Sequence, residues 1–72
     1  MGLHLNRMSP LRREVLMRLA DRGPMPLWEA LQGRRNVIPK LLMFGWTTSE
    51  SVDRITVHFN ITEAGRKALV NE

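Results

Sequence analysis

The chain has 72 residues, enough for one small domain, and it contains no cysteine. Disulfides and thiolate metal sites are therefore excluded. Eleven lysines and arginines against seven carboxylates give a formal net charge of +4, and nine of those cations are arginines. This excess favours an acidic partner, most simply nucleic acid, because arginine pairs well with phosphate and with guanine. A solvated basic surface without a partner is the alternative interpretation.

The first residues predict neither a membrane segment nor a leader. No apolar run approaches the roughly 20 residues of a membrane span, and residues 1–8 lack the apolar core and cleavage site of a signal peptide. We therefore expect a cytoplasmic protein with no membrane partner. Residues 1–8 are expected to form a weakly ordered lead-in from which Leu5 or Met8 packs on the domain, and residues 9–72 are expected to form that domain.

Ser9 and Pro10 predict the start of a first helix that runs to about residues 21–22. A serine hydroxyl can accept a hydrogen bond from a free N–H at the N-cap, and proline suits the first helical position. Gly23, followed by a proline, is expected to end the helix. Cations on its polar side are expected to be solvated rather than to contact DNA. They are Arg12, Arg13 and Arg18.

Two short helices separated by a glycine turn are predicted next. The first covers about residues 26–32 and ends at Gly33. The second has Asn36 as its N-cap, which puts Pro39 in the first turn, where a missing N–H costs little. A later start stays open, because proline disfavours helical conformation in the residue before it. Gly45 is expected to stop this helix, because the position after a helix often needs a positive φ. Two such helices form a helix-turn-helix arrangement.

The third predicted helix has a cationic N-terminal edge and an apolar side. The candidate DNA contacts in this region are Arg34, Arg35, Asn36 and Lys40. Arginine can read guanine O6 and N7, whereas Lys40 is expected to meet phosphate. The inward residues are expected to be Ile38, Leu41, Leu42 and Phe44. The alternative is a capping asparagine surrounded by solvated cations.

Alternating residues after this helix predict a β-hairpin, and a final helix follows it. Residues 46–49 form the first expected strand, residues 50–54 a polar tip, and residues 54–61 a return strand with one inward row. That row is Ile55, Val57, Phe59 and Ile61. Thr62 is expected to cap the last helix, in which Gly65 allows close backbone packing. The aromatic residues are expected in the core rather than as base-stacking platforms. They are Trp28, Phe44, Trp46 and Phe59.

The predicted order is helix, helix, helix, strand, strand, helix, an α+β fold with a three-helix core, a two-stranded hairpin and a short C-terminal helix. Two segments, LLMFGWTT at 41–48 and DRITVHFNITEAGRKAL at 53–69, carry a family likeness. With them, the chain resembles the winged helix-turn-helix domains of bacterial regulators of the MarR and PadR type. The likeness covers about residues 11–69.

This resemblance implies that the helix after the tight turn enters the major groove of DNA. In such regulators the hairpin, or wing, often carries an aspartate, one further residue and an arginine that reaches the minor groove. Here Asp53 and Arg54 are adjacent, so the spacing departs from that pattern. The resemblance makes Arg54 and His58 candidate DNA contacts on the wing, with an ordinary exposed strand face as the alternative. The regulators also have dimerisation and sensing helices that have no counterpart here, so no small-molecule ligand is implied.

Our main hypothesis is a small DNA-binding protein, a transcriptional regulator whose third helix, about residues 36–44, reads double-stranded DNA. Specific binding would need a homodimer or adjacent copies. The alternative is a winged-helix protein-interaction module, for example a phage-encoded modulator of a host complex. A basic architectural protein without sequence preference is a third interpretation. No catalytic constellation, phosphate-binding loop or metal-ligand spacing, including at His4 and His58, indicates an enzyme, a cofactor or a metal.

Overall fold

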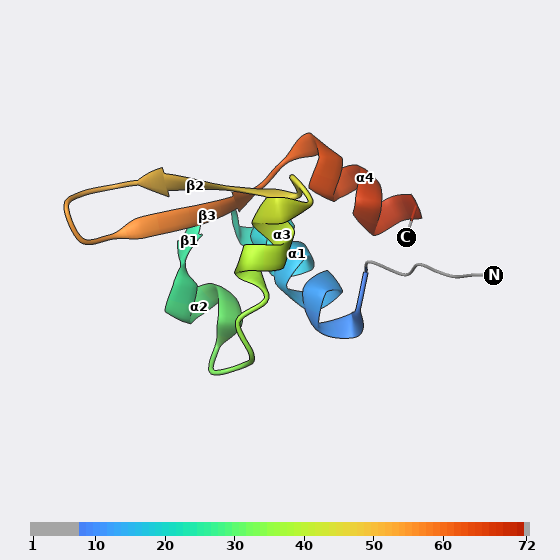
Figure 1. Cartoon of the computed structure of the whole chain (residues 1–72), viewed down its shortest axis with the longest axis horizontal. Coiled ribbons are helices and arrows are strands. Elements are labelled where there is room, and N and C mark those ends of the chain that lie inside the picture. Colours follow the sequence, from blue (N-terminus) through green and yellow to red (C-terminus); the bar gives the residue numbers. More distant parts are fainter. Residues whose placement is uncertain (1–7, 72) are drawn as a thin grey trace.

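The computed structural model describes residues 8–71, which form an α+β fold of four helices and one three-stranded antiparallel sheet. The elements are α1 (Pro10–Arg22), β1 (Met25–Pro26), α2 (Leu27–Leu31), α3 (Ile38–Met43), β2 (Thr47–Ser51), β3 (Val57–Ile61) and α4 (Glu63–Asn71) (Figure 1). Met8 is buried, as predicted, whereas the predictions for Leu5 and His4 lie outside the described residues. No helix within residues 8–71 combines the length and apolarity needed to cross a membrane.

Helix α1 has the start and the end that its sequence predicts. The backbone N–H of Arg12 donates to Oγ of Ser9 over 3.2 Å, and Pro10 opens the helix. At the other end, Gly23 has a φ of +87° and its N–H donates to the carbonyl of Leu19 over 2.8 Å. The inner face of α1 is fully buried. It consists of Val15, Leu16 and Leu19.

Strand β1 is an element that sequence reasoning missed. Pro26 was expected to open the second helix, but Met25 and Pro26 pair with β3 opposite Phe59 and His58, so the sheet order is β1-β3-β2. Pro26 has an extended backbone, with φ −71° and ψ 163°, and serves as the N-cap of α2. A two-residue pairing carries too little alternation to be recognised in sequence, and proline is tolerated at a sheet edge.

Helix α3 begins later than predicted. Val37, not Asn36, is the N-cap, and the later start left open in the sequence is the one observed. Asn36 still provides a hydrogen-bond acceptor for a free N–H of the first turn, because its Oδ1 accepts from the N–H of Ile38 over 3.0 Å. Pro39 lies in the first turn, as expected, and Gly45 follows the helix with a φ of +78°. The helix therefore spans six residues rather than the nine from 36 to 44.

The hairpin forms with the predicted strand order, but half of its expected inward row is exposed. Strands β2 and β3 pair in register from Thr47 opposite Ile61 to Ser51 opposite Val57. Ile61 is buried, whereas Val57 and Ile55 are exposed. The hairpin projects beyond the helices, so its outer half has no helix beneath it to bury the row (Figure 1).

Helix α4 packs against the start of the hairpin through its glycine. Thr62 Oγ1 accepts from the N–H of Gly65 over 3.0 Å and donates to the carbonyl of Gly45 over 2.7 Å. A Cβ at Gly65 would collide with the backbone carbonyl of Trp46 and lie 2.8 Å from Cγ1 of Ile61. Both predictions for this helix, the threonine cap and the close packing, are confirmed.

The core is formed by residues of all four helices and of the inner half of the sheet. Trp46 is buried within it, as predicted, and its ring centroid lies 4.8 Å from that of the half-buried Phe44. The prediction for Trp28 is wrong, since this side chain is 73% exposed. Helix α2 has only five residues, and its inner face is filled by Ala30 and Leu31.

Candidate nucleic-acid interface

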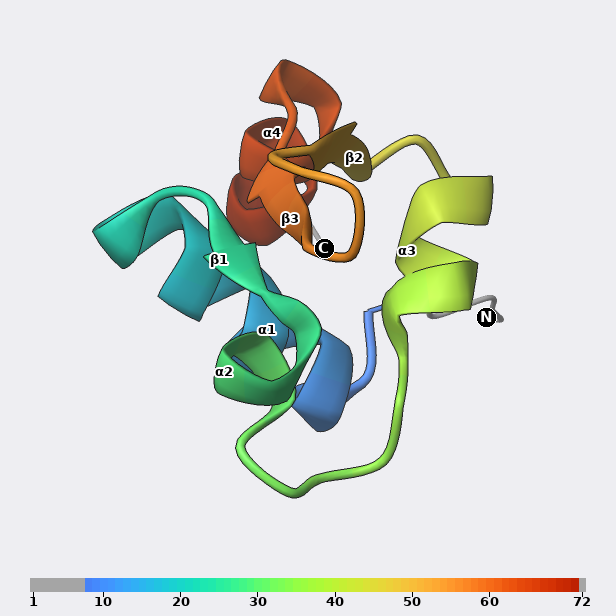
Figure 2. The same ribbon diagram turned by 90° about the vertical axis from the view of Figure 1, so that its left-hand side faces the viewer.

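The predicted contacts Arg34, Arg35, Asn36 and Lys40 all lie on the surface, around the N-terminal edge of α3. The first three belong to the connection between α2 and α3, which Figure 2 shows as a loop that swings away from the other elements. The expectation that this edge is exposed rather than packed inward is therefore confirmed. Exposure is necessary for contact with DNA, although it does not by itself indicate DNA.

Arg34 is held by a carboxylate. Its guanidinium donates to Oε1 of Glu14 on α1 over 2.8 Å, and its backbone N–H donates to the carbonyl of Leu31 over 3.0 Å. The Arg34 side chain remains 53% exposed. Its positive charge is therefore partly neutralised, and the loop is anchored to α1 at this residue.

Arg18 was expected to be solvated, and this prediction is wrong. Its side chain is only 16% exposed, and its guanidinium lies 3.2 Å from Oε2 of Glu14. The same guanidinium donates to the backbone carbonyl of Ala30 over 2.8 Å. Arg18 therefore joins α1 to α2, which is possible because the long arginine stem packs along the helices while its planar head forms several hydrogen bonds. Arg12 also departs from a purely solvated position, because its guanidinium carbon lies 5.4 Å from the Phe44 ring centroid.

Arg35 and Lys40 differ from Arg34 in their surroundings. Both are exposed, and within residues 8–71 neither is among the three ion pairs that the structure contains. The side-chain oxygen of Asn36 is engaged by Ile38, but an asparagine amide also has an NH₂ group that can donate. Arg35, Asn36 and Lys40 thus present hydrogen-bond donors on the surface around the start of α3.

The exposed face of α3 is more apolar than sequence reasoning anticipated. Leu42, expected to point inward, is 39% exposed, and Met43 is 66% exposed. Pro39 is exposed as well. Such side chains can touch thymine methyl groups but cannot read base edges through hydrogen bonds. The short length of α3 explains why Leu42 is more exposed than expected. With six residues, the helix has only Ile38 and Leu41 on its buried side.

The tip of the hairpin presents Arg54, which is exposed. Asp53 fixes this turn, because its Oδ1 accepts hydrogen bonds from the N–H groups of Ile55 over 2.9 Å and Thr56 over 2.8 Å. These backbone hydrogen bonds lower the pKa of the Asp53 carboxyl below its ordinary value. The sequence indicated a turn here but not this capping geometry.

His58 does not join the exposed cations. It is half-buried in β3, where it pairs with Pro26 on one side and Glu50 on the other. The residues from 47 to 61 carry two carboxylates, Glu50 and Asp53, against the single cation Arg54, so this hairpin has a formal charge of −1 with neutral histidine. Among the described residues, positive charge is therefore concentrated on the helices and on the loop before α3 rather than on the hairpin.

Other kinds of site find little support in these residues. Within residues 8–71, no group of three or more histidine, aspartate or glutamate side chains could hold a metal ion.

Comparisons of the chain with protein-family models, with curated proteins and with solved structures give no match. The interpretation of this surface therefore depends on its own geometry and charge.

Proposed function

We propose that this chain is a winged helix-turn-helix protein that binds double-stranded DNA and acts as a transcriptional regulator. In this proposal α2 and α3 are the two helices of the motif, and β2 and β3 form the wing. The α+β order and the short connection between α2 and α3 are compatible with that assignment.

The observation that carries the proposal is the exposed cationic edge of α3. Arg35 and Lys40 stand free of ion pairs within the described residues, and Arg34 remains half-exposed beside them. Arginine and lysine at a helix entrance can meet successive phosphates, and the release of counterions then supplies affinity. Sequence preference would come from Asn36 and from apolar contacts of α3 with thymine methyl groups.

The hairpin has a smaller part in this proposal. Arg54 is its one candidate contact, because His58 is half-buried and the two hairpin carboxylates repel phosphate. We therefore expect the Arg54→Ala variant to lose less DNA affinity than the Arg35→Ala variant.

The proposal can be tested by fluorescence anisotropy with a labelled random-sequence duplex across a series of salt concentrations. We expect affinity to fall as salt rises, with each lost phosphate contact reducing the logarithmic slope by about 0.9. A double variant, Arg35→Ala with Lys40→Ala, should bind more weakly and lower the slope by about 2. Selection of enriched sequences from a random pool would then show whether the protein prefers a site, as a regulator requires.

The chain offers a charge-matched control. Arg66 and Lys67 are exposed on α4, and replacing both with alanine removes the same one arginine and one lysine. Both double variants have a net charge of +2, which is the original +4 less two. Equal losses of affinity in the two double variants would show that only overall charge matters. Affinity that does not change with salt would contradict DNA binding altogether.

A second candidate function is a protein-interaction module of the same fold. It is favoured by the exposed apolar face of α3, where Leu42 and Met43 stand beside Pro39. Exposed apolar side chains on a short helix are more typical of a protein contact than of hydrogen-bonded base reading. A pull-down from nuclease-treated lysate separates the two candidates, because a partner that survives nuclease and is lost with the double variant Leu42→Ser, Met43→Ser supports the module.

A further inference from the structure

Three side chains tie the loop before α3 to helix α1, and through it to α2. Glu14 lies in the middle, with the guanidinium of Arg34 2.8 Å from its Oε1 and that of Arg18 3.2 Å from its Oε2. Arg18 continues the series of contacts, because its guanidinium also donates to the carbonyl of Ala30 on α2 over 2.8 Å. One of the exposed cations of the candidate interface is therefore already paired with a carboxylate of this chain.

The two arginines are held with different firmness. The Arg18 side chain is mostly buried and has two acceptors, the carboxylate of Glu14 and the carbonyl of Ala30. The Arg34 side chain is half-exposed, and among the described residues its guanidinium donates to Glu14 alone. Ion pairs as exposed as this one contribute little to stability, because water competes for both charges and salt screens them. Arg34 is therefore the partner that can leave.

Departure of the Arg34 side chain would leave neither Glu14 without a partner nor the loop without an anchor. Glu14 would keep its ion pair with Arg18, which lies one helical turn away on the same helix. The loop would keep its backbone hydrogen bond, in which the N–H of Arg34 donates to the carbonyl of Leu31 over 3.0 Å. The departure therefore needs only a rotation of one long, flexible side chain.

We propose that Glu14 is an autoinhibitory partner of Arg34, and that the guanidinium leaves it for a phosphate group when duplex DNA binds. A carboxylate and a phosphate present similar acceptor oxygens to a planar guanidinium, so one can replace the other. Arg18 keeps the carboxylate of Glu14 paired in both states. This inference rests on the proposed DNA-binding function and adds a control on its strength, because the DNA must compete with a contact inside the protein.

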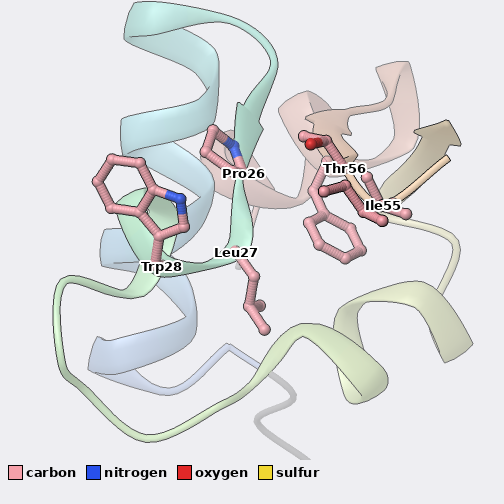
Figure 3. Close-up of a pocket in the computed structure, with 7 residues that line it drawn as sticks. Pro26, Leu27, Trp28, Ile55 and Thr56 are labelled. Atoms are coloured by element: carbon pink, nitrogen blue, oxygen red, sulfur yellow. The ribbon is translucent and has the colours of Figure 1, made fainter. Parts of the chain in front are cut away.

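An open groove at the start of α2 offers phosphate no competing site. It has a volume of about 310 Å³ and separates α2 from the hairpin, and Figure 3 shows Leu27 and Trp28 on one side of it and Ile55 on the other. Every residue that lines this groove is uncharged, so a phosphate would find no counter-charge there. The exposed cations around the start of α3 are therefore the better location for phosphate contacts.

A permanent structural role is the alternative for the ion pair between Glu14 and Arg34. In that case the guanidinium stays with the carboxylate when DNA binds, and removing it affects folding rather than the number of phosphate contacts. The two roles differ in the coupling between the two residues that DNA affinity reports. Only an exchange makes the benefit of removing the carboxylate depend on the presence of the guanidinium.

A double-mutant cycle tests the exchange by fluorescence anisotropy with a labelled random-sequence duplex. The four proteins are the wild type, Glu14→Gln, Arg34→Ala and the double variant. We expect Glu14→Gln to tighten binding about threefold when Arg34 is present, because the carboxylate no longer competes with phosphate for the guanidinium. In the Arg34→Ala background, the same substitution should give only the gain that Glu63→Gln gives through net charge. Circular dichroism checks that all of these proteins are folded.

The salt dependence of binding gives a second readout, which a purely structural ion pair would not change and which does not need the Glu14 substitution. Because Arg34 meets a phosphate in the proposed complex, Arg34→Ala should lower the logarithmic slope by about 0.9. The matched control is Arg35→Ala at the next position, which belongs to none of the ion pairs within residues 8–71. It should also lower the slope by about 0.9, but the gain from Glu14→Gln should remain about threefold in this background.

Each outcome bears on the proposal. Gains from Glu14→Gln that are equal with and without Arg34 would overturn the exchange and leave DNA binding standing. An unchanged slope in Arg34→Ala would do the same, because the guanidinium would then meet no phosphate. A wild-type protein that does not bind the duplex, or binds it without salt dependence, would overturn the proposed function and the exchange together.

Discussion

The carboxylate of Glu14 is shared by two arginines from different parts of the chain. Its Oε1 accepts from Arg34 over 2.8 Å, and its Oε2 lies 3.2 Å from Arg18 one helical turn further along α1. Glu14 thus connects α1 to the loop before α3 through Arg34. It also holds Arg18, whose guanidinium contacts α2 at the carbonyl of Ala30. The first of these links pairs Arg34, one of the candidate DNA-binding cations, with a carboxylate.

We predict that the Glu14→Gln variant binds duplex DNA more tightly than the wild-type protein, by about threefold. The change removes a negative charge beside the candidate interface and releases Arg34 for phosphate contact. Fluorescence anisotropy at constant salt measures the effect. The control is Glu63→Gln on α4, where the carboxylate lies 3.8 Å from Lys67 and the change in net charge is the same. Equal gains in both variants would refute a local role for Glu14.

The Arg18→Ala variant should lower the free energy of unfolding by about 1–3 kcal/mol. It leaves the carbonyl of Ala30 without its side-chain donor and removes the packed arginine stem between α1 and α2. Urea denaturation followed by circular dichroism gives the difference. Arg22 on the same helix is exposed, so Arg22→Ala should change stability by only a few tenths of a kcal/mol. A loss in Arg18→Ala no larger than this control would show that the contact is unimportant.

The Gly65→Ala variant should be destabilised by about 1–3 kcal/mol, although alanine normally favours a helix over glycine by up to about 1 kcal/mol. The added methyl group would meet the backbone carbonyl of Trp46 and Cγ1 of Ile61, so α4 must move away from the sheet. Thermal unfolding provides the measurement. Arg66→Ala, at the next position and exposed, should keep the wild-type melting temperature. A more stable Gly65→Ala protein would contradict the close packing described above.

Acid should loosen the tip of the hairpin. Hydrogen bonds from the N–H groups of Ile55 and Thr56 lower the pKa of Asp53 in the folded chain. A lowered folded-state pKa gives stabilisation that is present above the unfolded pKa and is lost as the pH falls through the folded value. The amide signals of Ile55 and Thr56 should therefore shift at a pH below about 4. In the Asp53→Asn variant these shifts should disappear, and their persistence would assign the transition to another group.

Much of the local structure could be predicted from sequence because it depends on neighbours along the chain. Ser9 and Thr62 cap their helices, and Gly23 and Gly45 end theirs with positive φ. Each of these assignments needs only a side-chain hydroxyl near free N–H groups, or a residue without a Cβ penalty. The exposed positions of the four cationic-edge candidates were also correct, since charged residues around a turn seldom become buried.

Apart from the N-cap of α3, which is Val37 rather than Asn36, the main errors concern contacts between residues far apart in the chain. Arg18 was taken as solvated, but its partner Ala30 lies twelve positions away on another helix. Trp28 was assigned to the core by its residue type and Ile55 by the alternation of its strand, but both are exposed. The apolar pattern of the sequence does not show where the core ends. Strand β1 exists only because β3 lies beside it.

The sequence alone determined the caps at Ser9 and Thr62, the stops at Gly23 and Gly45, the order of the larger elements and the positive charge ahead of α3, because these depend on interactions within a few residues. Only the tertiary structure decided that Glu14 restrains Arg34, that the hairpin extends past the helices and that Trp28 and Ile55 share an exposed groove. These features follow from how far each element reaches once packed, and the apolar pattern of a single segment contains no information about the length of its neighbours.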